Sequence, residues 1–408
     1  MAGCRGKLTE VVSQWGRWSH VGFQDSARRR HPGSMTTYKL TNNVVTHFPA
    51  IFKGLGSKAS VIHMALDVEL HGGVLAVRVA GGRPIECGKC SRSTVIELAQ
   101  ELRRRKHRVV LVEEACGFGY HFHRQLREIG VEAFVVATES LSGKRKTNRR
   151  DASKLLDQLY DFDVNGNKKA LRPIRVPSLK EQKSRRLCRM RSQLIKVRNI
   201  LEAQGRGLLF DFDFHDVPQG WWGPRKWPRV RAKLSAHDPW LIGMLEHHQR
   251  LLSAQQQRIS ELDWQIAQES NYDGRKVAKG LGPTTFASLE REAIDWKRFA
   301  NRKQIGSYIG CCPSEFSTGN KQKLGSIDRQ GNRRMRTLLV EAVWRLKKWN
   351  PAWRGFKKFP HVFGVHAMAR GATRKRAVVA CARLLAIDLW RLQTGRATLK
   401  NLGLKPAQ

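Results

Sequence analysis

Acidic residues are scarce in this 408-residue sequence: 34 Asp and Glu stand against 75 Lys and Arg, which gives a formal net charge of +41. Such an excess of positive charge requires a polyanionic partner, and nucleic acid is the first candidate. Apolar runs are short, and none approaches the ~18 uncharged residues that a membrane span needs. The first 35 residues contain Arg28, Arg29 and Arg30 but no apolar core, so we expect no secretory signal.

Cysteine is also sparse, with eight residues in the chain. This number is too small for a disulfide scaffold, and we expect free thiols in a reducing cytoplasm. Cys87 and Cys90 form a lone CxxC, but a structural zinc site needs further ligands at a suitable spacing, and Cys311-Cys312 does not provide it. We therefore interpret the CxxC segment as a turn between two strands, with a zinc site as the alternative.

The first half of the chain has the pattern of an α/β domain. Two apolar runs, 61–67 and 74–79, flank Gly72-Gly73 and predict a β-hairpin. Helical spacing follows over 93–106, and short apolar runs at 109–112 and 134–136 predict two further strands. We predict an N-terminal extension over 1–59, in which Met35 is an alternative start, and a mixed-sheet α/β domain over 60–176.

The rest of the chain reads as all-α. Heptad spacing predicts two apolar seams, at Leu187, Met190, Leu194, Val197 and Leu201, and at Leu241, Leu245, His248, Leu252, Gln255, Ile259, Leu262 and Ile266. The expected structure over 177–273 is an antiparallel coiled-coil hairpin that could also pair with a second copy. A mostly helical domain over 274–392 and a tail over 393–408 complete the chain.

Three acidic residues stand where strands end or a helix begins. Asp67 and Glu114 end apolar runs, and Asp151 lies at an expected helix start. If these side chains converge, they require a divalent cation, and Mg²⁺ prefers carboxylate oxygens. Two such ions can stabilise the attacking and leaving oxygens of a phosphodiester. The alternative is three ordinary solvated carboxylates.

Two segments of the C-terminal domain have the composition of phosphate contacts. The first, with Gly280, Gly282 and Thr284, is typical of a helix-hairpin-helix turn, in which a helix start holds a DNA phosphate; a structural corner between helices is the alternative. The second is a Ser/Thr/Gly-rich loop, 312–320, in which a serine could act as a nucleophile. No His or Asp base adjoins it, so a polar phosphate-binding loop is the alternative. Its basic neighbours, which we expect to contact nucleic acid, are Lys321, Lys323, Arg329, Arg333 and Arg336.

Taken in order, these segments resemble the insertion-sequence-110/1111 family of transposases, DEDD-type recombinases with a RuvC-like (RNase H-like) domain. The resemblance runs from Ser60 to Leu392. Its motifs are Met64-Ala-Leu-Asp67, Glu114-Ala-Cys-Gly-Phe-Gly-Tyr120, Lys146-Thr-Asn-Arg-Arg-Asp-Ala152, Gly280-Leu-Gly-Pro283, Tyr308-Ile-Gly-Cys-Cys-Pro313, Ser317-Thr-Gly319 and Gly331-Asn-Arg-Arg-Met-Arg-Thr-Leu338. The family motif selects Glu114 over Glu113.

The resemblance implies a site-specific DNA recombinase of bacterial mobile elements, located in the cytoplasm at the nucleoid. It implies a Mg²⁺ site, with two ions, formed by Asp67, Glu114, Asn148 and Asp151. Ser317 would attack the DNA backbone and become covalently linked to it, activated by the metals of the RuvC-like domain. The implied partners are donor and target DNA, a structured guide RNA and further copies of the chain, as a dimer and a tetramer.

One position departs from the family. Asn148 stands where the third acidic residue of the tetrad is Asp, and an amide oxygen can coordinate Mg²⁺ but brings no charge. Either activity tolerates this change, or another carboxylate such as Asp157 contributes, or catalysis has been lost. A hydrolytic junction nuclease and a nucleic-acid-binding relic without catalysis are therefore alternative functions.

Overall fold

The computed structural model describes residues 43–56, 58–137, 148–234, 239–316, 324–364 and 368–407. The chain forms two compact units, an N-terminal unit up to residue 176 and a C-terminal unit from residue 177. None of the helices in the described ranges is long and apolar enough to cross a membrane.

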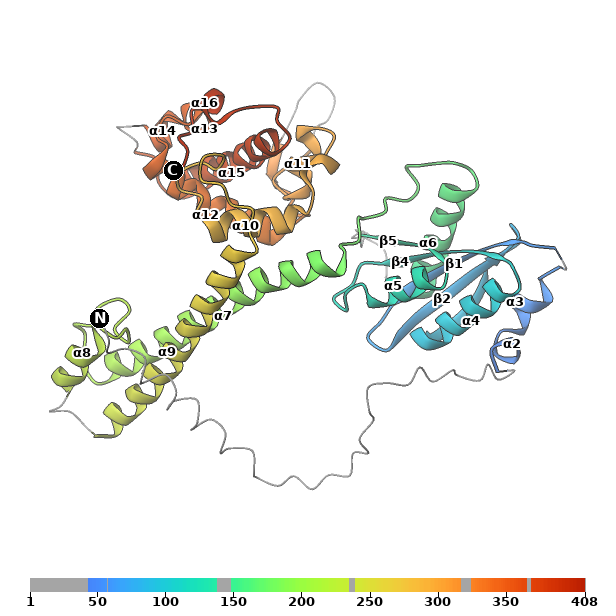
Figure 1. Ribbon diagram of the computed structural model, residues 1–408, viewed down its shortest axis with the longest axis horizontal. Helices are drawn as coiled ribbons and strands as arrows, with labels where there is room; N and C mark the ends of the chain where they lie inside the picture. Colours follow the sequence, from blue (N-terminus) through green and yellow to red (C-terminus); the bar gives the residue numbers. More distant parts are fainter. Residues whose placement is uncertain are drawn as a thin grey trace, which may run out of the picture. The chain divides into compact units, whose positions relative to one another are not determined.

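The N-terminal unit is built on a five-stranded mixed sheet with the order β3-β2-β1-β4-β5 (Figure 1). The strands β1, β2 and β3 pair antiparallel, whereas β4 is parallel to β1 and β5 is parallel to β4. Their bounds are Val61–Val68, Gly72–Val79, Ile85–Ser91, Arg108–Glu114 and Glu132–Val136. The expected hairpin, the two later strands and the mixed sheet are confirmed, and the arrangement is compatible with an RNase H-like domain.

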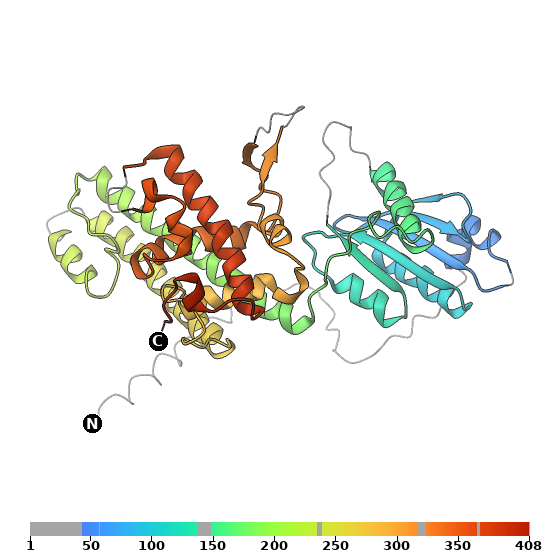
Figure 2. The same cartoon turned by 90° about the horizontal axis from the view of Figure 1, so that it is seen from above.

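Helices cover both faces of this sheet (Figure 2). On one face, α4 (Arg92–Arg104) and α5 (His121–Glu128) pack on a core that includes Met64, Leu66 and Leu111. The short helices α2 (Asn43–His47) and α3 (Pro49–Lys53) add apolar residues to the same core. On the other face, α6 (Asn148–Asp163) packs on a separate core that includes Ala65 and Val112. Successive side chains along β1 and β4 therefore point alternately toward α4 and α5 on one face and toward α6 on the other.

The CxxC segment is not a turn. Cys87 and Cys90 lie within β3, an edge strand, and Gly88 between them has a positive φ of 72° next to a register shift in the pairing with β2. A bulge of this kind accommodates a glycine inside a strand. The glycine between the two cysteines therefore suggested a turn, although the segment is a bulged strand. Burial raises the pKa of Cys87 to about 12, which keeps it a thiol.

The C-terminal unit begins with two long helices, α7 (Leu179–Asp211) and α9 (Pro239–Gln268), with α8 (Trp227–Leu234) between them. Hydrogen bonds join Ser184 to Glu269, Arg191 to Asp263 and Arg198 to Gln256, so the two helices run antiparallel. The apolar seam of α9 is buried from Leu241 to Ile266.

The predicted seam of α7 is confirmed only in part. Leu187 and Leu201 pack against clusters that contain residues of α9, whereas Val197 is 43% exposed. Arg191 and Arg198, which lie outside the predicted seam, pair with α9. Polar side chains that pair with α9 determine the rotation of α7, and the apolar repeat alone does not show them. Coiled-coil packing itself stays a prediction.

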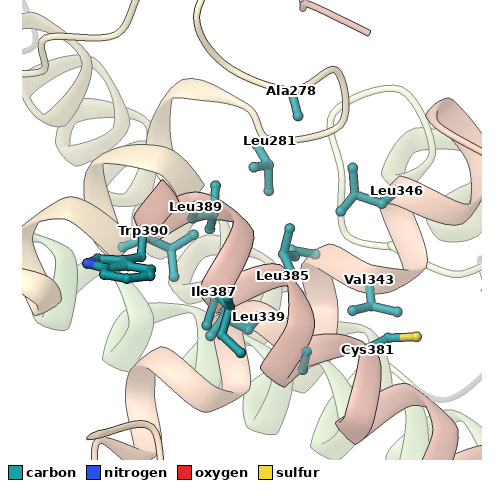
Figure 3. Close-up of a cluster of buried hydrophobic side chains, with 14 of the residues drawn as sticks. Ala278, Leu281, Leu339, Val343, Leu346, Cys381, Leu385, Ile387, Leu389 and Trp390 are labelled. Carbon is teal, nitrogen blue, oxygen red and sulfur yellow. The ribbon is translucent and has the colours of Figure 1, made fainter. Parts of the chain in front are cut away.

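The remaining helices form a compact bundle. They are α10 (Pro283–Ala293), a 3₁₀ turn (Trp296–Arg298), α11 (Arg302–Tyr308), α12 (Arg333–Trp349), α13 (Arg354–Lys357), α14 (Pro360–Phe363), α15 (Gly371–Gln393) and α16 (Leu399–Leu402). Two short strands, β6 (Pro313–Glu315) and β7 (Leu324–Ile327), pair between α11 and α12. Figure 3 shows the core between α12 and α15, with Leu339, Val343 and Leu385 at its centre.

The chain after α15 is part of this bundle. Leu402 and Leu404 are buried in the same core, and Ala278 forms a bridge with Pro406. The C-terminal segment thus packs on the loop that precedes α10.

Candidate functional site

Two of the predicted carboxylates lie side by side at the carboxyl ends of parallel strands. The β1–β4 register pairs Ala65 with Val112 and Leu66 with Glu113, so Asp67 and Glu114 occupy the next position on neighbouring strands. Asp67 alternates with Ala65, and Glu114 with Val112, and both of those residues face α6. Asp67 and Glu114 are therefore on the face of the sheet that α6 covers.

The third carboxylate stands on that covering helix. Asp151 is in the first turn of α6, beside Ala152, which is fully buried against the sheet. Asn148 is the first residue of α6, and its side chain lies outside the described part of the chain. Sheet and helix thus place Asp67, Glu114 and Asp151 on one side of the sheet. Within the described ranges, however, no three His, Cys, Asp or Glu side chains are grouped closely enough to hold a metal ion.

The neighbouring Glu113 is directed to the opposite face. Its carboxylate is buried, and its Oε1 atom lies 3.8 Å from Nδ1 of His123 on α5. Burial raises the pKa of Glu113 to about 7, against a weaker lowering effect of Arg92. The strand therefore separates the two adjacent glutamates, and only Glu114 shares a face with Asp67.

A buried polar network anchors the far end of α6. His63, on the same face of β1 and 1% exposed, has its Nε2 atom 2.9 Å from Oδ2 of Asp163, the last residue of α6. Arg108 donates to both Asp163 and Glu132, at 2.7 and 2.6 Å. Burial lowers the pKa of His63, and Arg108 holds the pKa of Asp163 below its usual range. We infer that this network fixes α6, and with it Asp151, on the sheet; sequence reasoning missed it because its members are up to 100 residues apart.

The glycine turn stands directly before α10. Residues 269–282 separate α9 from α10, so the turn does not join two consecutive helices tightly. Gly282 is the N-cap residue of α10 and has no side-chain cap, whereas Gly280 has a φ of +99°. Thr284, which we expected at a phosphate, donates its hydroxyl to Asp263 of α9 at 3.1 Å.

The predicted nucleophile lies between β6 and β7. Ser317, Lys321 and Lys323 fall outside the described residues, so only the base of their loop can be discussed. At this base, the backbone N–H of Asp328 donates to the carbonyl of Cys312 at 2.8 Å. The backbone N–H of Asn332 donates to the carbonyl of Tyr308 at 2.7 Å.

Side chains hold both sides of this base. Arg336 donates to the carbonyl oxygen of Ile309 at 2.6 Å and to that of Arg329 at 3.4 Å. The guanidinium group of Arg336 therefore already binds backbone carbonyls of the protein. A nucleic-acid phosphate would have to compete with these carbonyls for its N–H donors. Arg333 and the side chain of Arg329 are exposed.

A second network lies beneath the same base and involves Glu292, which is 3% exposed. Glu292 accepts hydrogen bonds from Arg189 of α7 at 2.9 and 3.0 Å and from Nδ2 of Asn332 at 3.0 Å. Tyr308 donates its hydroxyl to the carbonyl of Glu292 at 2.7 Å. Asn332 also caps α12, so one buried carboxylate connects α7, α10 and the start of α12. The motif Gly331-Asn332 in the sequence pointed to a structural role for Asn332. The sequence did not indicate that Glu292 is its partner.

Comparisons with known proteins agree on one class. Residues 276–358 match the model of the Transposase IS116/IS110/IS902 family. The chain is 26% identical over 263 residues to a probable family 20 transposase of Pseudomonas aeruginosa, covering 62% of this chain and 76% of that protein. It is 23% identical over 301 residues to the transposase for insertion sequence element IS1111A of Coxiella burnetii, covering 71% and 79%. A third relative is the transposase for insertion sequence element IS1328 of Yersinia enterocolitica, 21% identical over 240 residues, with 57% and 70% covered. The matched segment 276–358 contains both the glycine turn and the loop of Ser317.

Proposed function

We propose that this chain, which belongs to the IS110/IS1111 family of transposases, excises and inserts an insertion sequence by phosphoryl transfer on DNA. The observation that supports this chemistry best is the common face of Asp67, Glu114 and Asp151. Three carboxylates on one side of a sheet offer oxygen ligands to a divalent cation, whose charge would offset their mutual repulsion.

The proposed ligands of that cation are Asp67, Glu114, Asn148 and Asp151. Their oxygen donors fit Mg²⁺, which prefers carboxylates and tolerates amides. Two bound Mg²⁺ ions would stabilise the charge that develops on the oxygens of the scissile phosphodiester. The protein contributes the placement: parallel pairing sets Asp67 beside Glu114, and the His63–Asp163 contact holds α6 over them.

Ser317 is the proposed nucleophile of the second half of the chemistry. Its Oγ atom would form a bond to the phosphorus while the bond from phosphorus to one DNA oxygen breaks, and that oxygen would take up a proton. The bonds at Cys312, Asp328 and Arg336 support this role because they fix both ends of the loop.

The proposed nucleic-acid partners are donor DNA, target DNA and a structured guide RNA, bound by a dimer that forms a tetramer with the second DNA. The charge distribution supports extensive phosphate contact. Residues 297–376 contain 20 Lys and Arg and only three Asp and Glu, and this stretch surrounds the loop of Ser317. Exposed Arg329 and Arg333 are the described candidates for such contacts.

An excision assay with trapping of protein–DNA adducts tests the proposal. Asp67→Ala, Glu114→Ala and Asp151→Ala should each abolish excision while nucleic-acid binding persists. Glu128→Ala, an exposed carboxylate of the same unit, is the matched control and should retain activity. Full activity of any two of the three variants would refute the acidic site.

The nucleophile is tested by the site of the adduct. Ser317→Ala should bind nucleic acid without forming an adduct, whereas Thr318→Ala and Ser326→Ala should form one. Phosphate found on Ser314, Thr318 or Ser326 by mass spectrometry would refute the assignment. Cleavage without any adduct would favour the junction nuclease, and a wild-type chain that binds DNA without recombining it would favour the inactive relic.

Asn148 is tested by restoring the charge of the family motif. Asn148→Asp should keep or raise excision, because it adds a negative charge to the proposed cation site. A loss of activity would mean that Asn148 is not a ligand.

A further inference from the structure

A basic and aromatic surface cluster, formed by Lys279, Lys348 and Trp349, lies at the C-terminal end of α12. Trp349 is 42% exposed. The Nζ atoms of Lys279 and Lys348 lie 5.0 and 5.1 Å from the centre of its ring. An exposed indole with two ammonium groups within cation–π distance is a strongly polarised surface.

The cluster rests on a rigid support. A Cβ atom at Gly280 would lie 3.2 Å from Cδ1 of Trp349, so the backbone of the glycine turn packs closely on the edge of the indole. Asn350, which is almost fully buried, donates to the carbonyl of Lys279 at 2.5 Å and accepts from the N–H of Lys405 at 2.6 Å. The turn, the end of α12 and the C-terminal segment are therefore held together by one side chain.

Apolar residues on both sides of the turn attach it to the core. Figure 3 shows Ala278 and Leu281 projecting toward the buried cluster that contains Leu346. Because these anchors are buried, Lys279 and Gly280 between them keep a fixed position at the surface.

The positive charges of the cluster have no carboxylate partner among the residues that the structure describes. Across the described ranges, Lys279 and Lys348 form no ion pair with a carboxylate, and the same is true of Arg345, one turn before Trp349. Other basic residues of this unit do pair: Arg354 binds Asp388. A surface that combines a fixed exposed ring with unpaired cations suits a ligand that is both flat and anionic.

We propose that Lys279, Lys348 and Trp349 bind an unpaired, single-stranded segment of nucleic acid. A base stacks on the indole, and the two lysines, which lie over the ring in the free protein, turn outward to hold the flanking phosphates. Only an unstacked base exposes its face, which is why the site selects single strands over duplex. This inference rests on the proposed function, in which the chain binds DNA and a structured RNA. The strand could belong to DNA or to RNA, since both present unstacked bases and anionic phosphates.

Equilibrium binding of the full-length protein to labelled oligonucleotides tests this site. The probes are single-stranded DNA, single-stranded RNA and duplex DNA of one sequence. Trp349→Ala should weaken single-strand binding roughly five- to hundredfold, as stacked aromatic residues do. Trp349→Phe should retain part of the affinity, and duplex binding should change little. A larger loss for RNA than for DNA, or the reverse, identifies the source of the strand.

The lysines are tested separately because their replacement does not disturb the core. The double variant Lys279→Gln/Lys348→Gln should lower the slope of log K against log salt by about 1.4, the change expected for two single-strand phosphates. Two exposed lysines of α7 provide the charge-matched control, Lys183→Gln/Lys196→Gln, and Trp264→Ala of α9 provides an exposed indole control.

The outcomes separate this inference from the proposed function. If Trp349→Ala and the lysine variant bind single strands as tightly as the wild type does, or if the controls lose as much affinity, the site is refuted while excision by the wild type still stands. If the wild type excises no element and forms no adduct, the proposed function fails whatever the binding data show.

Discussion

Replacing Glu292 with alanine should destabilise the C-terminal unit by about 3 kcal/mol. The carboxylate is buried and accepts four hydrogen bonds, two from Arg189, one from Asn332 and a longer one of 3.4 Å from Arg185. Its removal leaves the guanidinium groups of Arg185 and Arg189, 15% and 28% exposed, without their counter-charge. Breaking a buried pair costs about 3–5 kcal/mol, and the lower end applies because Arg189 keeps some access to water.

Urea denaturation followed by tryptophan fluorescence measures this loss. All tryptophans except Trp15 and Trp18 lie in residues 177–408, so the signal reports on the C-terminal unit. The matched control is Glu261→Ala, which removes an exposed ion pair with Arg258 and should cost less than about 1 kcal/mol.

The effect should depend on pH in a defined direction. Burial disfavours the charged form of Glu292, but the hydrogen bonds from Arg189 and Asn332, together with the positive charges of Arg189 and Arg185, outweigh it and lower its pKa below 4.5. A carboxylate whose pKa is depressed by folding contributes stability above its unfolded pKa and loses it as the pH falls through the folded pKa. The difference between wild type and Glu292→Ala should therefore be full at pH 7 and shrink below pH 4.5. A difference at pH 7 no larger than that of the control would refute the reasoning.

Three further predictions concern the loop base and the sheet. Arg336→Ala should lower the free energy of unfolding by about 2 kcal/mol, because backbone carbonyls lose a charged hydrogen-bond donor. Arg333→Ala should instead weaken nucleic-acid binding without changing stability. If Arg336→Ala weakens binding and Arg333→Ala lowers stability, Arg336 is a nucleic-acid contact after all. Gly331→Ala should cost about 1–3 kcal/mol, because its Cβ would lie 2.5 Å from the backbone nitrogen of Gly310, and an unchanged denaturation midpoint would contradict this close approach. Because burial raises the pKa of Glu113 to about 7, stability should fall as the pH rises from 4.5 to 7, and Glu113→Gln should remove this fall in thermal melts.

The sequence by itself determined the elements whose signal is local. Alternating and continuous apolar runs predicted β1, β2, β4 and β5, because a strand buried on a sheet must be apolar at short range. The seam of α9 was predicted for the same reason, since each of its apolar residues packs inward. Motif order also brought Asp67, Glu114 and Asp151 together as candidates before any geometry was known.

The tertiary structure decided what depends on residues far apart in the chain. The rotation of α7 follows from Arg191 and Arg198 pairing with α9, and β3 exists because β2 offers an edge to the CxxC segment. Glu292 joins Arg189 and Asn332 across 103 and 40 residues. A periodic pattern records whether a position is buried, but the partner of a buried charge is set only when helices pack. For this reason the network under the Ser317 loop and the exposed indole of Trp349 became visible only in the folded chain.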